Sequence, residues 1–417
     1  MSTSHIESLH AKNIRQFGTI DVKFNKKFNF ISGPNGCGKT SILTCISHCF
    51  FYGSSEYSRI RESTEFWTDF TSKNIKYRVG LGKGSYHGDE YRKATIRTWG
   101  PIPTETNRTT LTAHETQKNA KIYCPLFLGA NRGITYKQIS GMQRELELDQ
   151  KCTDYAQVGI RSLHGEHRHD IKQWIVNRDF IIEKDWAQEE RKNWNHLITS
   201  LPTIAPFDSN FSYIRTGRNL EPTFSIYGQE CYLEELSSGF QAILSIIANI
   251  FEWIEGSRPE GERDVSTAQG TVLIDELDLH LHPEWQFTLR EGLISIFPNL
   301  QFIVTTHSPH LLASAGPGEV IAMHKPEGSE VYDLQPTPHT YSGWNTDQIL
   351  HEIMGVRSLE NKQYEKLIAE AFILVDAGTP EELEVAIQKL GDIAHPSDTI
   401  VSVLQAKLAA KTATYND

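Results

Sequence analysis

The chain has 417 residues, of which 39% are hydrophobic and 22% charged, a balance typical of a globular protein and not of a disordered one. Its formal net charge of −11 excludes binding of polyanions through overall charge, so a nucleic-acid contact would need a local basic strip. The sequence shows neither an N-terminal secretion signal nor a run of about eighteen apolar residues, which predicts a cytoplasmic protein without membrane contact.

The first part of the chain has the pattern of a β-rich lobe. Apolar alternation or short apolar runs predict strands over 6–11, 18–24, 28–31, 77–80, 93–98 and 121–128. Helical spacing of apolar residues follows the third of these strands, over 40–51. The polar stretch 53–118 is therefore expected to be a β-rich insert on this lobe.

The remainder of the chain shifts toward helical spacing. Residues 143–200 carry periodic aromatic and aliphatic side chains, which predict a small helical subdomain without the sustained heptads of a coiled-coil arm. Further on, strands are predicted at 223–233, 271–274 and 301–304, and helices at 238–254, from Pro283, and throughout the tail, with breaks at 378–380 and 395–396. The expected domains are an N-terminal lobe, a mainly helical insert, a C-terminal lobe and a helical tail, at 1–140, 141–220, 221–340 and 341–417.

A phosphate-binding loop follows the predicted strand at 28–31. The run from Gly33 to Thr40 matches G-x-x-x-x-G-K-[ST], in which glycines let backbone N–H groups turn toward a phosphate. In such a loop Lys39 reaches the β- and γ-phosphates, and Thr40 offers its hydroxyl to Mg²⁺. The alternative is a glycine turn with a chance lysine, but the flanking strand and helix favour the phosphate loop. The expected nucleotide-binding residues here are Gly33, Pro34, Asn35, Gly36, Cys37, Gly38, Lys39, Thr40 and Ser41.

A pair of carboxylates ends the predicted strand at 271–274. Asp275 is suited to hold a metal ion, and Glu276 is suited to act as the base that orients an attacking water. Many strands end in Asp-Glu as a solvated edge, so this pair is ambiguous alone. The phosphate loop earlier in the chain favours the catalytic interpretation.

Two further features lie on either side of this carboxylate pair. Ser237, Ser238 and Gly239 open the predicted helix at 238–254, and a small Ser-x-Gly turn at a helix N-terminus is an anion site. A simple N-cap is the alternative there. His307 follows the strand at 301–304, where a packing or surface role is the alternative to catalysis.

In their order along the chain (33–40, 237–239, 275–276 and 307), the four features resemble the ATPase heads of the RecF, SMC and OLD group of ABC-type ATPases. The stretches 13–17, 275–286 and 305–310 are especially similar to the compact AAA-family ATPases of bacterial anti-phage defence, such as the Septu and PARIS ATPase subunits. The resemblance implies an α/β fold: an ABC-ATPase head of the P-loop NTPase class, with a mixed sheet and β-rich N-terminal lobe. A helical insert and a helical C-terminal tail complete it.

The resemblance also implies roles for individual residues. The protein would hydrolyse ATP with Mg²⁺, and Ser237 and Gly239 would contact the γ-phosphate of ATP bound by another subunit. Asp278 would lie in the loop that crosses the dimer interface, and His307 would sense the γ-phosphate. Transporters have Ser-Gly-Gly where this chain has Ser-Ser-Gly, which fits the SMC-like branch.

The motif inventory leads to an expectation about assembly. The chain has one phosphate loop and one signature turn, Ser237 to Gly239. In this arrangement the signature turn of one head faces the phosphate loop of another head, so a complete site needs at least a homodimer. The first functional hypothesis is an ATPase that controls a separately encoded effector, a nuclease or toxin. The second is a RecF-like DNA-repair or chromosome-maintenance ATPase whose output is DNA binding. A nucleotide-binding scaffold without turnover is disfavoured by Glu276.

Three weaker signals point to other chemistry. The histidines at 164, 167 and 169 resemble a metal cluster, but a polar surface loop is favoured because no ligand set accompanies them. Basic residues between 73 and 97 interleave with aromatics, and here a solvated hairpin face is favoured over a phosphate-backbone contact. The run 372–376 suggests a Toprim nuclease edge, but the helical spacing after it argues against a nuclease.

Overall fold

The computed structural model describes residues 3–88, 91–167, 170–206, 208–324, 331–356, 361–395 and 398–415. The chain divides into two compact units, Met1–Gly355 and Val356–Asp417. Among the described residues, no helix combines the length and the apolar character needed to span a bilayer. The finer division at residues 140, 220 and 340 stays a prediction.

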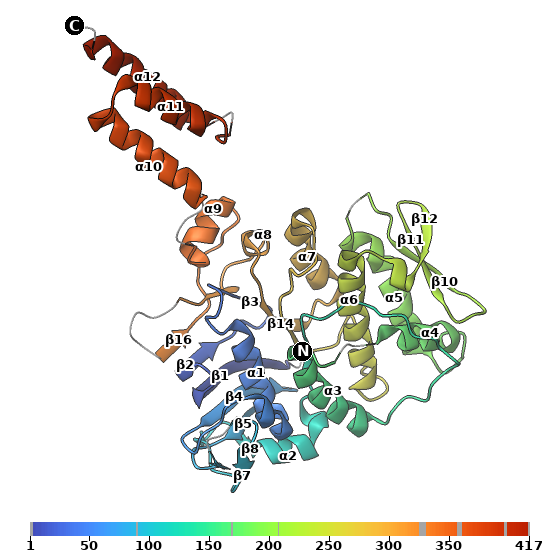
Figure 1. The fold of residues 1–417 in the computed structure, drawn as a ribbon. Coiled ribbons are helices and arrows are strands. Elements are labelled where there is room, and N and C mark those ends of the chain that lie inside the picture. Colours follow the sequence, from blue (N-terminus) through green and yellow to red (C-terminus); the bar gives the residue numbers. More distant parts are fainter. Residues whose placement is uncertain are drawn as a thin grey trace. The chain divides into compact units, whose positions relative to one another are not determined.

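A six-stranded sheet forms the N-terminal part of the first unit (Figure 1). Its strands run in the order β16-β2-β1-β4-β5-β8, and β1 pairs antiparallel with both β2 and β4. The strands are β1 His5–Ile14, β2 Phe17–Lys23, β4 Glu65–Ser72, β5 Ile75–Leu81, β8 Thr109–Thr112 and β16 Val331–Leu334. The strands predicted at 6–11, 18–24 and 77–80 are therefore confirmed.

Short elements complete this lobe: the 3-10 turns η1 Tyr52–Tyr57 and η2 Ala120–Ile122, the strands β6 Tyr86–His87 and β7 Thr95–Ile96, and the helix α2 Ala113–Lys118. The strand predicted over 93–98 is only two residues long, because the N–H groups of Arg97 and Thr98 both turn back to the Ser85 carbonyl. The strand predicted over 121–128 was wrong in its first half. Pro125 lacks the N–H that a ladder needs, and β9 Leu126–Leu128 begins only after it.

A five-stranded parallel sheet carries the phosphate loop. Its order is β15-β3-β14-β13-β9, with β3 Phe28–Ser32, β13 Gly270–Ile274, β14 Leu300–Thr305 and β15 Val320–Ala322 beside β9. Ile274 lies opposite both Val304 and Leu128, and Thr305 lies opposite Ile31. The four strands around β13 and β14 thus end at one edge, where ligands of parallel α/β sheets bind. The strands predicted at 28–31, 271–274 and 301–304 are confirmed.

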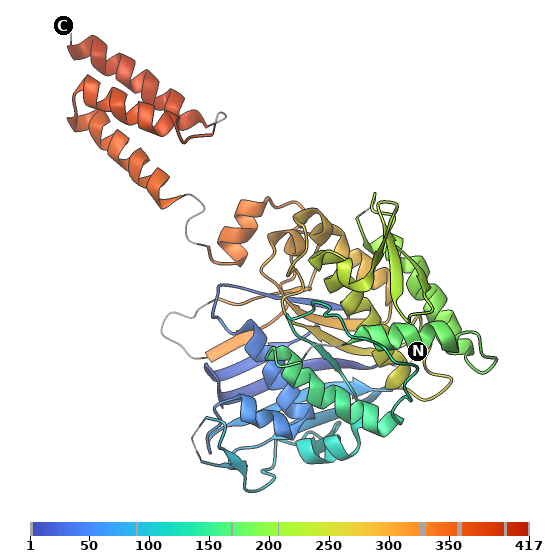
Figure 2. The same ribbon diagram turned by 45° about the vertical axis from the view of Figure 1, so that its right-hand side comes forward.

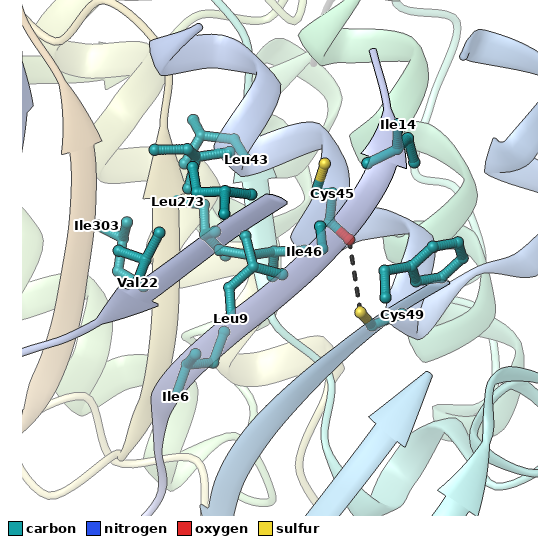
Figure 3. Close-up of a cluster of buried hydrophobic side chains, with 14 of the residues drawn as sticks. Ile6, Leu9, Ile14, Val22, Leu43, Cys45, Ile46, Cys49, Leu273 and Ile303 are labelled. Atoms are coloured by element: carbon teal, nitrogen blue, oxygen red, sulfur yellow. Dashed lines mark hydrogen bonds between the residues drawn. The ribbon is translucent and has the colours of Figure 1, made fainter. Parts of the chain in front are cut away.

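The main core lies between the two sheets, around the helix α1 Lys39–Phe50. Figure 3 shows Leu9 of the six-stranded sheet, Ile46 of α1, and Leu273 and Ile303 of the parallel sheet in one cluster, and all four are fully buried. The helix α1 is buried on almost every side, and its buried residues include the polar Thr44, Ser47 and His48. This packing fixes the start of α1, and with it the phosphate loop, against both sheets.

Helices cover the remainder of the first unit: α3 Leu148–Leu163, α4 Ile171–Ile181, α5 Gln188–Ile204, α6 Ser238–Gly256 and α7 Pro283–Ile296. The helical prediction for 143–200 and the helices at 238–254 and from Pro283 are confirmed. A small antiparallel sheet, β10 Ser212–Thr216, β11 Pro222–Ile226 and β12 Gln229–Tyr232, lies beside α4 and α5 (Figure 1). The prediction at 223–233 found two of its strands and missed β10.

The remaining elements are divided between the two units. The turn η3 Leu233–Glu235, the helices α8 Pro309–Ala313 and α9 Thr346–Gln348, and the π-helix η4 Ile349–Ile353 lie in the first unit. The second unit contains α10 Lys362–Ala377, α11 Pro380–Gly391 and α12 Thr399–Tyr415, side by side in Figure 2. Thr379 and Glu382 form a capping box at the start of α11, which confirms the break at 378–380. Of the other predicted break, Pro396 lies outside the described residues.

One buried histidine gives the first unit a pH-dependent stability. His48 of α1 is fully buried, and its two ring nitrogens lie 2.6 Å from the Ser54 hydroxyl and 2.8 Å from the Ser58 hydroxyl. Burial, with repulsion from Arg15 and His164, lowers the pKa of His48 to about 3. Below pH 6.5 the unfolded chain binds this proton and the folded chain does not, so stability falls as the pH falls toward 3.

His48→Asn is expected to flatten this pH dependence. From pH 7 to pH 5 the folded wild type loses about 2 kcal/mol of unfolding free energy through His48 alone. Urea denaturation at both pH values measures the loss, with the exposed His87→Asn of the same lobe as control. An equal pH dependence in wild type and His48→Asn would contradict the assignment.

Candidate active site

The phosphate loop connects β3 to α1, as the sequence predicts. Gly38 is the N-cap residue of α1 with φ of 106°, a left-handed conformation that favours glycine. A Cβ atom on Gly38 would lie 1.9 Å from Nε2 of Gln16, whose Oε1 accepts a hydrogen bond from Ser41 at 3.0 Å. A Cβ atom on Gly33 would lie 2.3 Å from the Met323 carbonyl oxygen. Two other segments of the same chain, at Gln16 and at Met323, therefore pack against the loop from two sides.

Lys39 lies across this loop. Its Nζ donates hydrogen bonds to the carbonyl oxygens of Gly33 at 2.9 Å and Pro34 at 3.1 Å, and the residue is 6% exposed. Burial lowers the pKa of Lys39, against the attraction of Asp275 and Glu276. A desolvated ammonium held by neutral carbonyls gains when a charged phosphate oxygen becomes its partner. The loop is arranged to receive a polyphosphate at this point.

Asp275 lies at the end of β13, within reach of the first turn of α1. The Thr40 hydroxyl donates to its two carboxylate oxygens at 2.9 and 3.0 Å, and Thr305 of β14 donates at 2.6 Å. Burial raises the pKa of Asp275, opposed by these hydrogen bonds and by the charges of Arg132 and Lys39. Adjacent hydroxyl and carboxylate oxygens are the ligands that Mg²⁺ prefers, so Thr40 and Asp275 fit this ion.

Glu276 follows in an unusual backbone conformation. Its φ is 49°, in the left-handed region that non-glycine residues rarely adopt. Its N–H donates to the Thr305 hydroxyl at 2.7 Å. Within the described part of the chain, its carboxylate has no hydrogen-bond or ion-pair partner. The strained turn thus presents a carboxylate that stays available for another group.

Asp278 and His307 form the next layer of the site. One carboxylate oxygen of Asp278 accepts hydrogen bonds from the Thr306 hydroxyl at 2.6 Å and from the His307 backbone N–H at 3.1 Å. Burial, followed by the positive charge of Lys39, lowers the pKa of His307. The imidazole of His307 is therefore neutral at pH 7. The carboxylate of Asp278 joins the chain after β13 to the chain after β14.

The Ser-Ser-Gly turn lies at the start of α6. Ser237 is the N-cap residue of this helix, yet its hydroxyl makes no capping hydrogen bond and the residue is exposed. Gly239 is buried, and a Cβ atom there would lie 3.1 Å from the His280 carbonyl oxygen and 3.4 Å from the Trp285 ring. Glycine at position 239 therefore lets the turn pack closely against the chain that follows Asp278.

The structure adds a residue to the site that the motifs did not indicate. Arg132 lies just after β9, is 5% exposed, and donates to the carbonyl oxygens of Asp275 at 2.7 Å and of Glu276. The sequence contained one signal for it, a Gly-Ala-Asn-Arg turn after an apolar run, at 129–132. Only the pairing of β9 with β13 places this turn beside the carboxylates.

The histidines and basic residues singled out as weaker signals have other partners in the structure. The His164 ring stacks on Tyr57 with centroids 4.7 Å apart, while His169 lies outside the described residues. The described residues contain no group of three His, Cys, Asp or Glu side chains that could hold a metal ion. Arg78 is buried and paired with Asp69 at 2.7 Å and Glu105 at 2.7 Å, so it does not belong to the solvated hairpin face expected from the sequence.

Comparison with known proteins gives this site a family. Residues 112–313 match the family described as "AAA domain, putative AbiEii toxin, Type IV TA system", and residues 8–201 match a family described as "AAA domain". The Septu protein PtuA of Bacillus thuringiensis is 30% identical over 411 residues, which cover 97% of this chain and 98% of that protein. The chain belongs to the Septu PtuA family. This confirms the expected ABC-type ATPase of anti-phage defence.

Two other relatives of this PtuA-family chain differ in coverage. The "Retron Ec83 probable ATPase" of Escherichia coli is 46% identical over 378 residues, covering 73% of this chain and 69% of that protein. A DNA replication and repair protein RecF of Lachnospira eligens is 36% identical over only 87 residues, covering 21% of this chain and 22% of that protein. The PtuA-family chain is therefore a nucleotide-binding ATP hydrolase whose similarity to defence ATPases extends much further than its similarity to RecF.

Proposed function

We propose that this ATPase assembles as a homodimer or higher homo-oligomer around ATP and thereby controls a separately encoded effector, a nuclease or a toxin. The observation that carries the proposal is the state of Ser237. Its hydroxyl is exposed at a helix N-terminus and makes no capping hydrogen bond, while the one phosphate loop lies at the edge of the parallel sheet. A second chain's Ser237 is suited to complete that site.

The chain's own residues take distinct roles in this proposal. Lys39 and the loop N–H groups bind the β- and γ-phosphates, and Thr40 and Asp275 would hold Mg²⁺, which neutralises phosphate charge. Glu276 orients the attacking water and accepts its proton. His307 donates a hydrogen bond from its imidazole N–H to the γ-phosphate. The partner's Ser237 and Gly239 close the site from the other side, so ATP joins the two chains.

Effector control rests on the family relationship. The similarity to Septu PtuA extends over 97% of this chain, including the helical insert and the C-terminal unit. We place the effector's docking surface on these two parts because neither contains a residue assigned to ATP binding. Co-purification of the chain with the products of neighbouring genes tests whether an effector binds, and recovery of the chain alone would argue against effector control.

DNA binding as the output is the weaker alternative. It is supported by the short RecF match. The basic stretch between 73 and 97, for which a phosphate-backbone contact was the less favoured interpretation, includes Arg78, which is buried in ion pairs, and Lys73, which pairs with Glu262 at 2.8 Å. DNA affinity that falls steeply with salt would favour this alternative. No detectable DNA binding at about 50 mM salt would exclude this alternative.

The assembly is tested by mixing two inactive variants. Ser237→Arg keeps its phosphate loop but blocks the partner's site, and Lys39→Ala keeps its Ser237 but lacks the loop lysine. Each alone is expected to be inactive. Random pairing gives about half heterodimers, each with one intact site, so the mixture should recover about a quarter of wild-type turnover.

The controls separate assembly from folding. Ser266→Arg places the same side chain at an exposed serine in the loop before β13 and should leave turnover unchanged. Light scattering with and without ATP measures the assembly directly. A mixture no more active than either variant would argue that the sites are not shared between chains.

A further inference from the structure

Arg132 occupies a buried position directly behind the carboxylate turn. Besides its hydrogen bonds to the carbonyl oxygens of Asp275 and Glu276, its Nε donates to the Gly129 carbonyl oxygen at 3.1 Å. Burial lowers the pKa of Arg132 to about 10, opposed by attraction to Asp275, Asp278 and Glu276, so the guanidinium stays charged at pH 7. Its Nη1 is buried and has no hydrogen-bond partner among the described residues.

The two carbonyl contacts bear on the strain at Glu276. A non-glycine residue in the left-handed region costs of order 1–3 kcal/mol, and it persists only when surrounding contacts hold it. Asp275 contributes the carbonyl before Glu276, and Glu276 contributes its own, so one planar guanidinium group fixes the peptide groups on both sides of this residue. On the opposite side, the Thr305 hydroxyl holds the Glu276 N–H.

The segment that carries Arg132 is itself held at its other end. The Ile134 N–H donates to the Gln241 side-chain oxygen at 2.9 Å, and the Gln241 amide donates to the carbonyl oxygens of Glu234 and Leu236 at 3.0 and 2.9 Å. Gln241 lies in the first turn of α6, close to Ser237. A short stretch of chain therefore runs between the Glu276 turn and the signature turn.

We propose that Arg132 is a positioning residue that holds Glu276 in the conformation from which its carboxylate orients the attacking water. This inference rests on the proposed role of Glu276 as the base. Arg132 acts through the backbone carbonyls of the turn and takes no part in binding the nucleotide. Its loss therefore lowers the rate of hydrolysis and leaves ATP affinity in place.

The test compares Arg132→Lys with wild type for ATP affinity and for turnover at saturating ATP. Lysine keeps the charge but has one donor nitrogen, whereas Arg132 uses two: Nε binds the Gly129 carbonyl and Nη2 binds both carbonyls of the turn. Displacement of a catalytic group by about 1 Å lowers rates by about 100-fold, which is the loss of kcat expected here, while the Kd for ATP should change by less than about threefold.

A matched control exists at the opposite end of the same strand. Arg258 is half-buried over the Trp253 ring, and its guanidinium donates to the carbonyl oxygen of Gln269, just before β13. Arg258→Lys removes the same kind of contact away from the carboxylates. It should keep wild-type kcat even where thermal unfolding shows that its Tm has fallen as far as that of Arg132→Lys.

The double variant Arg132→Lys/Glu276→Gln tests the route of the effect. If Arg132 acts through Glu276, the double variant is no slower than Glu276→Gln alone, because the group that Arg132 positions is already lost. Additive losses would overturn the proposal, as would a wild-type kcat in Arg132→Lys or a loss of ATP affinity that parallels the loss of kcat. A wild-type rate in Glu276→Gln instead refutes the base assignment itself, so the two failures are distinguishable.

Discussion

Lys39→Ala is expected to weaken ATP binding by about 10- to 150-fold, the factor that corresponds to one hydrogen bond to a charged group. The Lys39 ammonium is nearly buried and its present partners are the carbonyl oxygens of Gly33 and Pro34. A triphosphate would replace these neutral partners by charged oxygens, so the lysine stabilises the bound state more than the free one. Titration with a fluorescent ATP analogue measures the affinity, and phosphate release measures the accompanying loss of turnover.

Lys27→Ala is the matched control for this substitution. Lys27 precedes β3, the same strand whose other end leads to the phosphate loop, and its Nζ donates to the Pro298 carbonyl oxygen. Removing it also deletes a lysine-to-carbonyl contact, but away from the loop. Equal loss of ATP affinity in the two variants would show a general effect on folding, and unchanged affinity in Lys39→Ala would refute the phosphate-loop assignment.

The sequence predicted the parallel sheet more accurately than the irregular lobe around it. Strands such as 271–274 are buried on both faces, so their apolar runs are plain in the sequence. The segment 121–128 is also largely apolar, but Pro125 divides it into a 3-10 turn and a short strand. The apolar pattern alone did not predict that break. None of the five residues of β10 is fully buried, so the strand shows no alternation of buried and exposed residues by which to find it.

For the candidate site, the motifs predicted residues whose side chains the structure brings together at the strand ends. Their proximity is then a consequence of register: Ile274 opposite Val304 places Asp275 next to Thr305. Arg132 was missed because its hydrogen bonds go to backbone carbonyls, which leave no trace in a sequence. Its place depends on β9 pairing with β13 across more than a hundred residues of chain, a long-range pairing that no local pattern specifies.

Glu276→Gln is expected to abolish most ATP hydrolysis and to leave ATP binding intact. Glutamine has the same size and the same backbone preferences, so the left-handed conformation at this position is no more costly than before. Within the described residues the carboxylate has no partner, so the substitution breaks no ion pair of the folded chain. The amide cannot accept a proton from water, and loss of a general base lowers kcat by about 10²- to 10⁴-fold.

The expected signature is therefore a chain that binds ATP and stays in the ATP-bound assembly. Single-turnover phosphate release gives the rate, and size-exclusion chromatography with ATP gives the assembly. Glu291→Gln, at an exposed position of α7, makes the same chemical change away from the site and should hydrolyse ATP at the wild-type rate. Hydrolysis at the wild-type rate in Glu276→Gln would assign the base to another residue. A loss of ATP binding in Glu276→Gln would mean that Glu276 contributes to the affinity for ATP itself. The proposed role of Glu276, as the base that follows the Mg²⁺-ligand candidate Asp275, does not predict that result.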